Sequence, residues 1–265
     1  MSLLGTFIVP HPPLIIPEVG RGEEEKIKDT IDAYKKIAKE ISHLKPETII
    51  VLSPHSTNYQ DYFHISPGEQ AKGDFRNFGA NVSVEVEYDQ AFIEDIETLA
   101  QKENFPTGTK GERDNRLDHA TMIPLYFINE FYKDYQVIRI GLSGLSLKKH
   151  WAFGKLIKKA CESRDKNYVI VASGDLSHKL KEEGPYGYAK EGPVFDESVT
   201  KAIKDNDLKQ LMDYKDNFID KAAECGLRSF VIMAGAIEDE DFSSNLLSYE
   251  GPFGVGYAVA SFLPK

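Results

Sequence analysis

The densest group of reactive side chains follows directly on the apolar run Tyr168–Ala172. An uninterrupted apolar run of this length is typical of a strand that is buried on both faces of a parallel sheet. The run stops abruptly, and the residues that follow include two hydroxyls, a carboxylate and an imidazole: Ser173, Gly174, Asp175, Ser177 and His178. The sequence therefore predicts a buried strand with chemical groups at its C-terminal end.

One chemistry for these residues is hydrolysis, with Ser173 or Ser177 as the nucleophile. Asp175 and His178 would then complete a catalytic triad. The spacing argues against this interpretation, because triad members normally converge from separate elements of a fold. The serines also lack the G-x-S-x-G pattern of a nucleophile elbow. A serine hydrolase is therefore the weaker hypothesis.

Two other predicted strands are also followed by a histidine. Leu3–Val9 leads to His11, and Thr48–Leu52 leads to His55. In α/β sheets, ligands bind in the crevice beyond the carboxyl ends of the strands. We therefore expect these two histidines to converge with His178, although the three lie far apart in the sequence.

A divalent metal would suit such a convergence. His11 and His55 could bind one face of the ion together with Glu224, which precedes the apolar helix predicted at Leu227–Ala236. Two histidines and a carboxylate with open positions allow Fe(II) to bind substrate and oxygen together. The same ligands could hold catalytic Zn(II) with a water. Cys225 could replace Glu224 as a ligand, although a small buried core thiol is the simpler interpretation.

A fourth histidine, His119, opens the apolar helix predicted at Met122–Phe131. The dipole at a helix N-terminus favours a neutral imidazole. The remaining histidines, His43, His64 and His150, lack a setting at a strand or helix end, and we predict structural roles for them.

Strands and amphipathic helices alternate along the chain. The predicted helices include Glu23–His43, Gln90–Glu103, Lys148–Ser163 and Pro193–Asn206, and the further predicted strands are Val82–Val86, Tyr135–Ile140, Asn245–Glu250 and Gly256–Phe262. We expect a single α/β domain over residues 1–265, with a mostly parallel or mixed central sheet flanked by helices.

The remaining segments have less regular patterns. Tyr62–Ile65 and Asp74–Phe78 are expected to form short antiparallel strands, and Phe105–Arg116 a Gly-rich, charged loop. The loop Gly184–Gly192 is long enough to act as a lid over a site.

The composition is that of an acidic globular protein. Its net charge of −10 argues against non-specific binding to nucleic acid or to an anionic membrane, since both need clustered Lys and Arg. No apolar run approaches the roughly 20 residues that span a bilayer. Met1–Val9 lacks the basic and apolar regions of a signal peptide, so we expect a cytoplasmic protein. The two cysteines, Cys161 and Cys225, do not make a disulfide framework.

Five segments in order resemble the LigB-like class III extradiol ring-cleavage dioxygenases and the related Memo-like proteins. They are PHPPLIIPEVG, VLSPHS, LDHAT, VASGDLSH and AAECGLRSFVIMAGA, followed by the closing GVGYAVASF. The resemblance covers nearly the whole chain. It implies a LigB-like fold and Fe(II) ligation by His11, His55 and Glu224, with Zn(II) as the alternative metal.

The same resemblance implies a non-haem extradiol dioxygenase that opens a small aromatic diol with O2, next to the diol. His178 would be the acid/base, because a group with a pKa near 6.5 can take a phenolic proton and later return it. Asp175 would orient His178, and His119 would face the substrate.

Two departures keep other functions open. Dioxygenases of this family often use a small second subunit to cover the pocket, and no segment here resembles one. Memo-like proteins carry a cysteine near the position of Glu224. The alternatives are a Memo-like metal-binding protein without ring cleavage, paired with a radical-SAM enzyme, and a Zn(II)-dependent hydrolase. A homo-oligomer is compatible with each.

Overall fold

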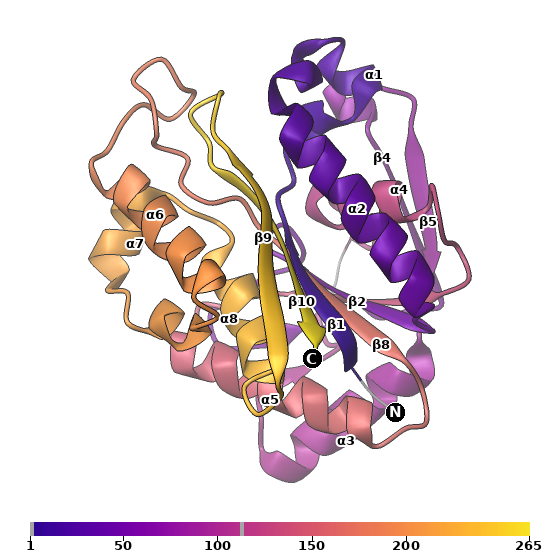
Figure 1. Cartoon of the computed structure of the whole chain (residues 1–265). Helices are drawn as coiled ribbons and strands as arrows, with labels where there is room; N and C mark the ends of the chain where they lie inside the picture. Colours follow the sequence, from indigo (N-terminus) through magenta and orange to yellow (C-terminus); the bar gives the residue numbers. More distant parts are fainter. Residues whose placement is uncertain (1–2, 112–113) are drawn as a thin grey trace.

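The computed structural model, which describes residues 3–111 and 114–265, is built around a six-stranded sheet in the order β7-β2-β8-β1-β10-β9 (Figure 1). The strands are β1 (Leu3–Val9), β2 (Thr48–Ser53), β7 (Gln136–Gly141), β8 (Tyr168–Ser173), β9 (Phe242–Glu250) and β10 (Tyr257–Pro264). Neighbouring strands among β7, β2, β8 and β1 are parallel, whereas β10 pairs antiparallel with both β1 and β9. The predicted α/β class with a mixed central sheet is confirmed.

Helices cover the sheet on both faces (Figure 1). On one face α2 (Lys28–Leu44) packs against α4 (His119–Ile128), and on the other α5 (Leu147–Glu162) packs against α8 (Leu227–Ala236). The other helices are α1 (Pro17–Gly20), α3 (Gln90–Glu103), α6 (Glu191–Lys204) and α7 (Asp216–Ala222), with 3₁₀ turns η1 (Pro13–Ile15), η2 (Glu23–Ile27), η3 (Arg76–Phe78) and η4 (Leu208–Met212). The helix predicted from Glu23 thus begins as a 3₁₀ turn.

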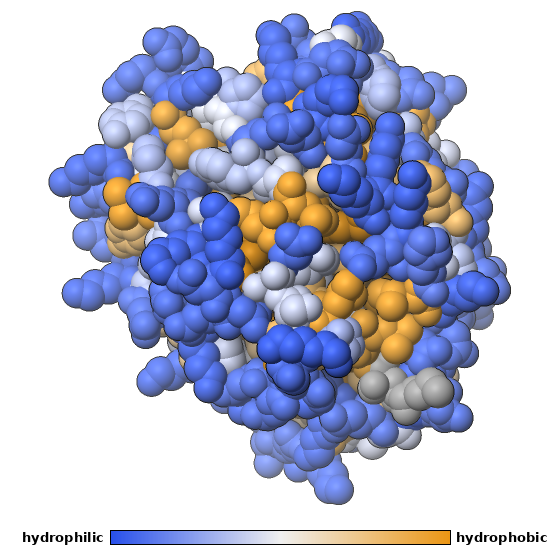
Figure 2. All heavy atoms as spheres, in the orientation of Figure 1, coloured by the Kyte–Doolittle hydropathy of each residue, from blue (hydrophilic) through white to orange (hydrophobic). Residues whose placement is uncertain are grey.

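The central strands are apolar because they are covered on both sides. Every residue of β2 and of β8 is buried, and burying one Val, Leu or Ile side chain contributes about 1.5–3 kcal/mol. Figure 2 shows that hydrophilic side chains cover most of the visible face, with apolar surface gathered between β9 and α2. Within the described ranges, none of the helices combines the length and apolar character needed to span a membrane.

The region between β2 and α3 differs from the sequence expectation. β3 (Phe63–His64) pairs in parallel with β6 (Thr107–Gly108), and β4 (Gln70–Asp74) pairs antiparallel with β5 (Ser83–Glu87). The prediction of a strand over Asp74–Phe78 was therefore wrong beyond its first residue, and the antiparallel pairing predicted for Tyr62–Ile65 was wrong for β3.

The physical reason is a turn that follows β4. The chain turns through η3 and leaves it at Gly79, whose φ of +83° is readily adopted by glycine. The predicted loop Phe105–Arg116 contains β6, and residues 112–113 of that loop lie outside the described residues.

The parallel strands deliver the predicted site residues to one edge of the sheet. In the sheet, Ser173 at the end of β8 lies opposite Val9 of β1, and Ala172 lies opposite Leu52 of β2. The residues that follow these three strands therefore leave the sheet at the same level.

Candidate metal centre

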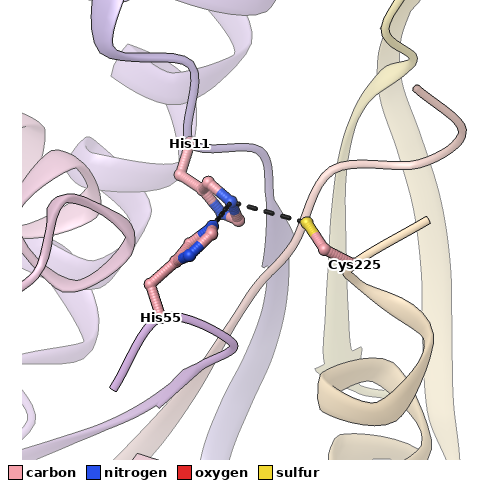
Figure 3. A group of neighbouring side chains, drawn as sticks. All are labelled: His11, His55 and Cys225. Carbon is pink, nitrogen blue, oxygen red and sulfur yellow. Dashed lines mark hydrogen bonds between the residues drawn. The ribbon is translucent and has the colours of Figure 1, made fainter. Parts of the chain in front are cut away.

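Three side chains from distant parts of the chain meet at this carboxyl edge (Figure 3). The Nε2 atoms of His11 and His55 are 3.1 Å apart, and the Sγ atom of Cys225 is 3.5 Å from His11 Nε2. His11 follows β1, His55 follows β2, and Cys225 lies between α7 and α8. One possible ligand atom from each lies within 4.8 Å of the others. Two imidazoles and a thiol that face one another in this way form a donor set for a divalent metal.

The end of β8 orients His11. The backbone N–H of His11 donates to Asp175 Oδ1 over 2.7 Å, and its Nδ1 lies 3.0 Å from Ser173 Oγ. Nε2 is therefore the nitrogen that faces His55 and Cys225. Metal-binding histidines are commonly held in this way, with a polar partner on the second ring nitrogen.

Asp118 joins the His55 loop to the helix that begins at His119. Its Oδ1 accepts hydrogen bonds from Ser53 Oγ over 2.6 Å and from the backbone N–H of Thr121 over 2.9 Å. Ser53 Oγ in turn accepts from the backbone N–H of His55. The ring centroids of His55 and His119 are 4.3 Å apart. A single N-cap residue thus sets the positions of both histidines.

Two glycines allow the turn after β8 to touch the turn before α8. A Cβ atom on Gly174 would lie only 2.1 Å from the Cα atom of Gly226, so no other residue fits there without a backbone shift. The backbone N–H of Gly226 donates to the carbonyl oxygen of Asp175 over 3.0 Å. This close approach places Cys225 beside Asp175.

Asp175, His178 and Cys225 form a second group whose possible ligand atoms lie within 4.8 Å of one another. The His178 Nε2 atom is 3.9 Å from Asp175 Oδ2. His178 Nδ1 lies 2.6 Å from the carbonyl oxygen of Ala223. Because a carbonyl oxygen only accepts, Nδ1 carries the proton and Nε2 carries the lone pair. Tyr186, from the predicted lid loop, packs edge-on against this imidazole with ring centroids 5.1 Å apart.

Among the residues that the structure describes, Glu224 belongs to neither of these two ligand groups. Its Oε2 atom accepts a hydrogen bond of 2.6 Å from the backbone N–H of Leu227, at the start of α8. The thiol of the neighbouring Cys225 takes the place beside the two histidines. Ligation by Glu224, which remains a prediction, would require its side chain to move toward His11 and His55.

Burial keeps the histidines of the site neutral. It lowers the pKa of His11 well below its ordinary value, and positive charge on His55 would lower it further. Burial, followed by the effect of His55, lowers the pKa of His119 to about 4. Burial also lowers the pKa values of His55 and His178. The neutral imidazole is the form that binds a metal.

The acidic groups of the site are shifted in the opposite direction. Burial raises the pKa of Asp175 to about 7, against the lowering effect of the His11 N–H, and it raises the pKa of Glu224 to about 7. The pKa of the Cys225 thiol is raised well above its ordinary value by burial and by the charges of Asp175 and Glu224. A divalent cation would replace these protons, since metal ligation favours carboxylate and thiolate.

A cavity of about 540 Å³ opens beside His55 and His119. The ring of Phe78 lies 5.5 Å from the ring of His119, centroid to centroid, and gives the cavity an aromatic wall. The buried Arg139 also lines it and has a guanidinium nitrogen 3.8 Å from Asp118 Oδ2. Such a cavity is large enough for a single-ring aromatic molecule.

A larger cavity, of about 1040 Å³, lies near the opposite edge of the sheet. Glu47, Gln136 and Lys166, which line it, stand at or just before the starts of β2, β7 and β8. It contains none of the predicted site residues, so the smaller cavity is the better candidate for a substrate.

The structure brings together the residues predicted from the strand and helix ends, namely His11, His55, His119, Asp175 and His178. Sequence reasoning did not single out Asp118, Phe78 or Tyr186, and it favoured a core role for Cys225. Asp118 did carry a signal, because an aspartate directly before an apolar helix is a preferred N-cap.

Comparisons with known proteins find relatives along nearly the whole chain. The family model described as the catalytic LigB subunit of aromatic ring-opening dioxygenase matches residues 5–260. Protein CA_C1420 of Clostridium acetobutylicum is 41% identical over 98% of this chain, and the chain spans 57% of that protein. The 2-aminophenol 1,6-dioxygenase beta subunit of a Pseudomonas species is 25% identical, with 98% of this chain and 94% of that protein aligned.

More distant relatives cover both of the groups that the sequence resembles. The 3,4-dihydroxyphenylacetate 2,3-dioxygenase of Escherichia coli is 24% identical over 82% of this chain and 83% of its own length. A MEMO1 family protein of Methanobrevibacter smithii is 24% identical over 50% of this chain and 43% of its own length. The crystal structure of an uncharacterized Escherichia coli K12 protein, JW3007, superposes with a TM-score of 0.68 over 98% of this chain and 99% of its own. At 12% identity, that superposition shows the shared fold alone.

Proposed function

Because the chain belongs to the LigB family, we propose that it is an Fe(II)-dependent dioxygenase that opens the ring of a catechol-type aromatic diol with O2. The observation that carries the proposal is the pair of Nε2 atoms of His11 and His55, 3.1 Å apart, with an aromatic-walled cavity beside His55. Two of the relatives are named for aromatic substrates with neighbouring polar substituents, 2-aminophenol and 3,4-dihydroxyphenylacetate.

The donor atoms fit a divalent metal. His11 and His55 would hold it through Nε2, and Cys225 is the third donor in the observed conformation. Glu224 is the third ligand that family resemblance implies, and it would have to leave the N–H of Leu227 or turn its other oxygen toward the ion. Two histidines and one anionic donor leave positions open for the diol and O2.

A bound Fe(II) supplies the electron transfer between an electron-rich ring and O2. The residues of the chain supply proton transfer and orientation. His178 takes a hydroxyl proton from the diol at Nε2, because its Nδ1 already carries a proton toward the Ala223 carbonyl. The Asp175 carboxylate, 3.9 Å away, stabilises the imidazolium that results. His119 and Phe78 line the cavity that receives the ring.

A second candidate function is a Memo-like metal-binding protein that does not cleave rings. The position of Cys225 favours it, since a thiol beside two imidazoles suits Zn(II) as well as Fe(II). The MEMO1 family relative aligns with half of the chain.

Oxygen consumption tests the dioxygenase. Protein purified without oxygen and loaded with Fe(II) should bind about one ion per chain tightly. It should consume O2 with catechol, 3,4-dihydroxyphenylacetate or 2-aminophenol and give a ring-opened product that absorbs visible light. His178→Gln should lower the rate roughly 10²–10⁴-fold with the metal retained, whereas His55→Ala should lose the metal. His43→Ala, at an exposed histidine, is the matched control and should change neither quantity.

The outcomes separate the two candidates. Metal binding without turnover across the diol panel would refute the dioxygenase and favour the Memo-like function. Wild-type protein that binds no metal would refute both.

A further inference from the structure

The second group of possible ligands, Asp175, His178 and Cys225, lies beside the first and shares only Cys225 with it. Nitrogen, oxygen and sulfur ligands bind zinc at about 2.0–2.3 Å, so two atoms on one ion are at most roughly 4.6 Å apart. Among the described residues, these five side chains fall into two groups of three. The ligand atoms within each group lie within 4.8 Å of one another, but the five do not form a single group of this kind. One ion therefore does not reach all five side chains in this conformation.

The donor atoms of the second group already point inward. The His178 Nε2 atom carries a lone pair, since Nδ1 is fixed by the carbonyl of Ala223. One oxygen of Asp175 accepts from the N–H of His11. The other oxygen has the Nε2 atoms of His178 and His11 as its nearest ring nitrogens, at 3.9 and 4.0 Å, which is too long for a hydrogen bond.

Burial makes the ionised form of Asp175 costly without a cation. Only 6% of Asp175 is exposed, so a carboxylate there has lost most of its hydration. Buried charges are normally paired or coordinate a metal. The nearest ring nitrogens to the inward-facing oxygen, those of His178 and His11, are 3.9 and 4.0 Å away and donate no hydrogen bond to it.

We propose that Asp175, His178 and Cys225 form a second divalent-cation site, selective for an ion that accepts nitrogen, oxygen and sulfur ligands, such as Zn(II). Cys225 is shared with the ion held by His11 and His55. The second site inhibits ring opening, because the His178 lone pair that binds this cation is the one that takes the substrate proton. The inhibitory part rests on the proposed dioxygenase function, whereas the binding site does not.

Metal stoichiometry tests the binding site independently of activity. Metal-free protein is titrated with Zn(II) or Co(II) and freed of unbound ion, and the metal per chain is measured by elemental analysis. Wild-type protein should bind two equivalents, the second more weakly. Asp175→Asn keeps an oxygen for the N–H of His11 and should bind one equivalent, as should His178→Ala. His55→Ala should lose the tighter equivalent, and the surface control His43→Ala should bind two.

Each result decides a separate claim. One equivalent in the wild type, or two in both Asp175→Asn and His178→Ala, would overturn the second site. No bound metal in the wild type would overturn the first site as well. Circular dichroism on each variant distinguishes loss of a ligand from loss of the fold.

Activity then tests inhibition. In Fe(II)-loaded enzyme, added Zn(II) should reduce O2 consumption as the second equivalent binds, and His43→Ala should be inhibited at the same Zn(II) concentration. Inhibition that develops before the second equivalent binds, or none when it has bound, would overturn the inhibitory role. If no diol is turned over, the proposed function fails while the stoichiometry still decides the site.

Discussion

Asp118→Ala should weaken metal binding although Asp118 is not a ligand. Its carboxylate accepts hydrogen bonds from Ser53 Oγ and from the backbone N–H of Thr121. Ser53 accepts in turn from the backbone N–H of His55. Removing the carboxylate releases the end of β2 from the start of α4, so the His55 imidazole loses its fixed position opposite His11.

The structure also sets the size of the effect. Loss of an N-cap costs about 1 kcal/mol, and loss of the hydrogen bond between Ser53 and a charged carboxylate costs about 1.5–3 kcal/mol. Asp118→Ala should therefore lower the free energy of unfolding by roughly 3 kcal/mol. Groups that orient metal ligands typically change metal affinity 10–100-fold when removed, and we expect a decrease of about that size here.

Asp89→Ala is the matched control. Asp89 caps α3 through the N–H of Phe92 and accepts a 2.6 Å hydrogen bond from Thr48 Oγ1, at the other end of β2. It also pairs with Lys166, as Asp118 does with Arg139, so its loss should destabilise the fold by a comparable amount. Urea unfolding measures both stabilities, and competition with a chromogenic chelator measures both metal affinities. Equal metal affinities in Asp118→Ala and Asp89→Ala would refute the positioning role.

Three further predictions test the turns around the site and the buried Asp196 of α6, which accepts a hydrogen bond from the backbone N–H of Ser177. Cys225→Ser should weaken metal binding more than Glu224→Gln, because the thiol and not the carboxylate lies beside the histidines. Chelator competition measures the metal affinity of both variants, and a larger loss of affinity in Glu224→Gln would show that Glu224 is the ligand. Gly174→Ala should lower the free energy of unfolding by about 1–3 kcal/mol and weaken metal binding. The added Cβ atom would clash with Gly226 and displace the turn that carries Cys225. Unchanged metal affinity would contradict this reasoning. Burial raises the pKa of Asp196 to about 7. The unfolded chain therefore releases that proton at a lower pH than the folded protein. The stability that protonated Asp196 gives the metal-free protein should be lost as the pH rises from about 4 to 7. Asp196→Asn should remove up to about 4 kcal/mol of this dependence, as measured by urea unfolding at pH 4 and pH 8, and an unchanged pH dependence would exclude Asp196 as its source.

The convergence of histidines could be predicted because it depends on a regular feature. Apolar runs mark buried strands, and parallel strands end at one edge of a sheet. His11 and His55 lie only a few residues beyond β1 and β2, so little chain separates each from its strand. The sequence therefore leaves few alternative positions for the side chains of these two histidines.

The choice between Glu224 and Cys225 could not be predicted in the same way. Both lie in an irregular turn, where adjacent side chains diverge and no periodicity indicates which one faces inward. The turn is shaped by Ala223, with a φ of +51°, and by the contact between Gly174 and Gly226. These features depend on two segments about fifty positions apart, and single-sequence patterns do not report such contacts.

The metal centre and the proton-transfer group are coupled through His11. Its backbone N–H holds Asp175, and its Nε2 atom faces His55 and Cys225. A substitution of His11 would therefore disturb both the metal ligands and the carboxylate beside His178, and loss of activity would not distinguish them. His55 and His178 belong to separate ligand groups, so the pair His55→Ala and His178→Gln separates binding of the metal held by His11 and His55 from proton transfer.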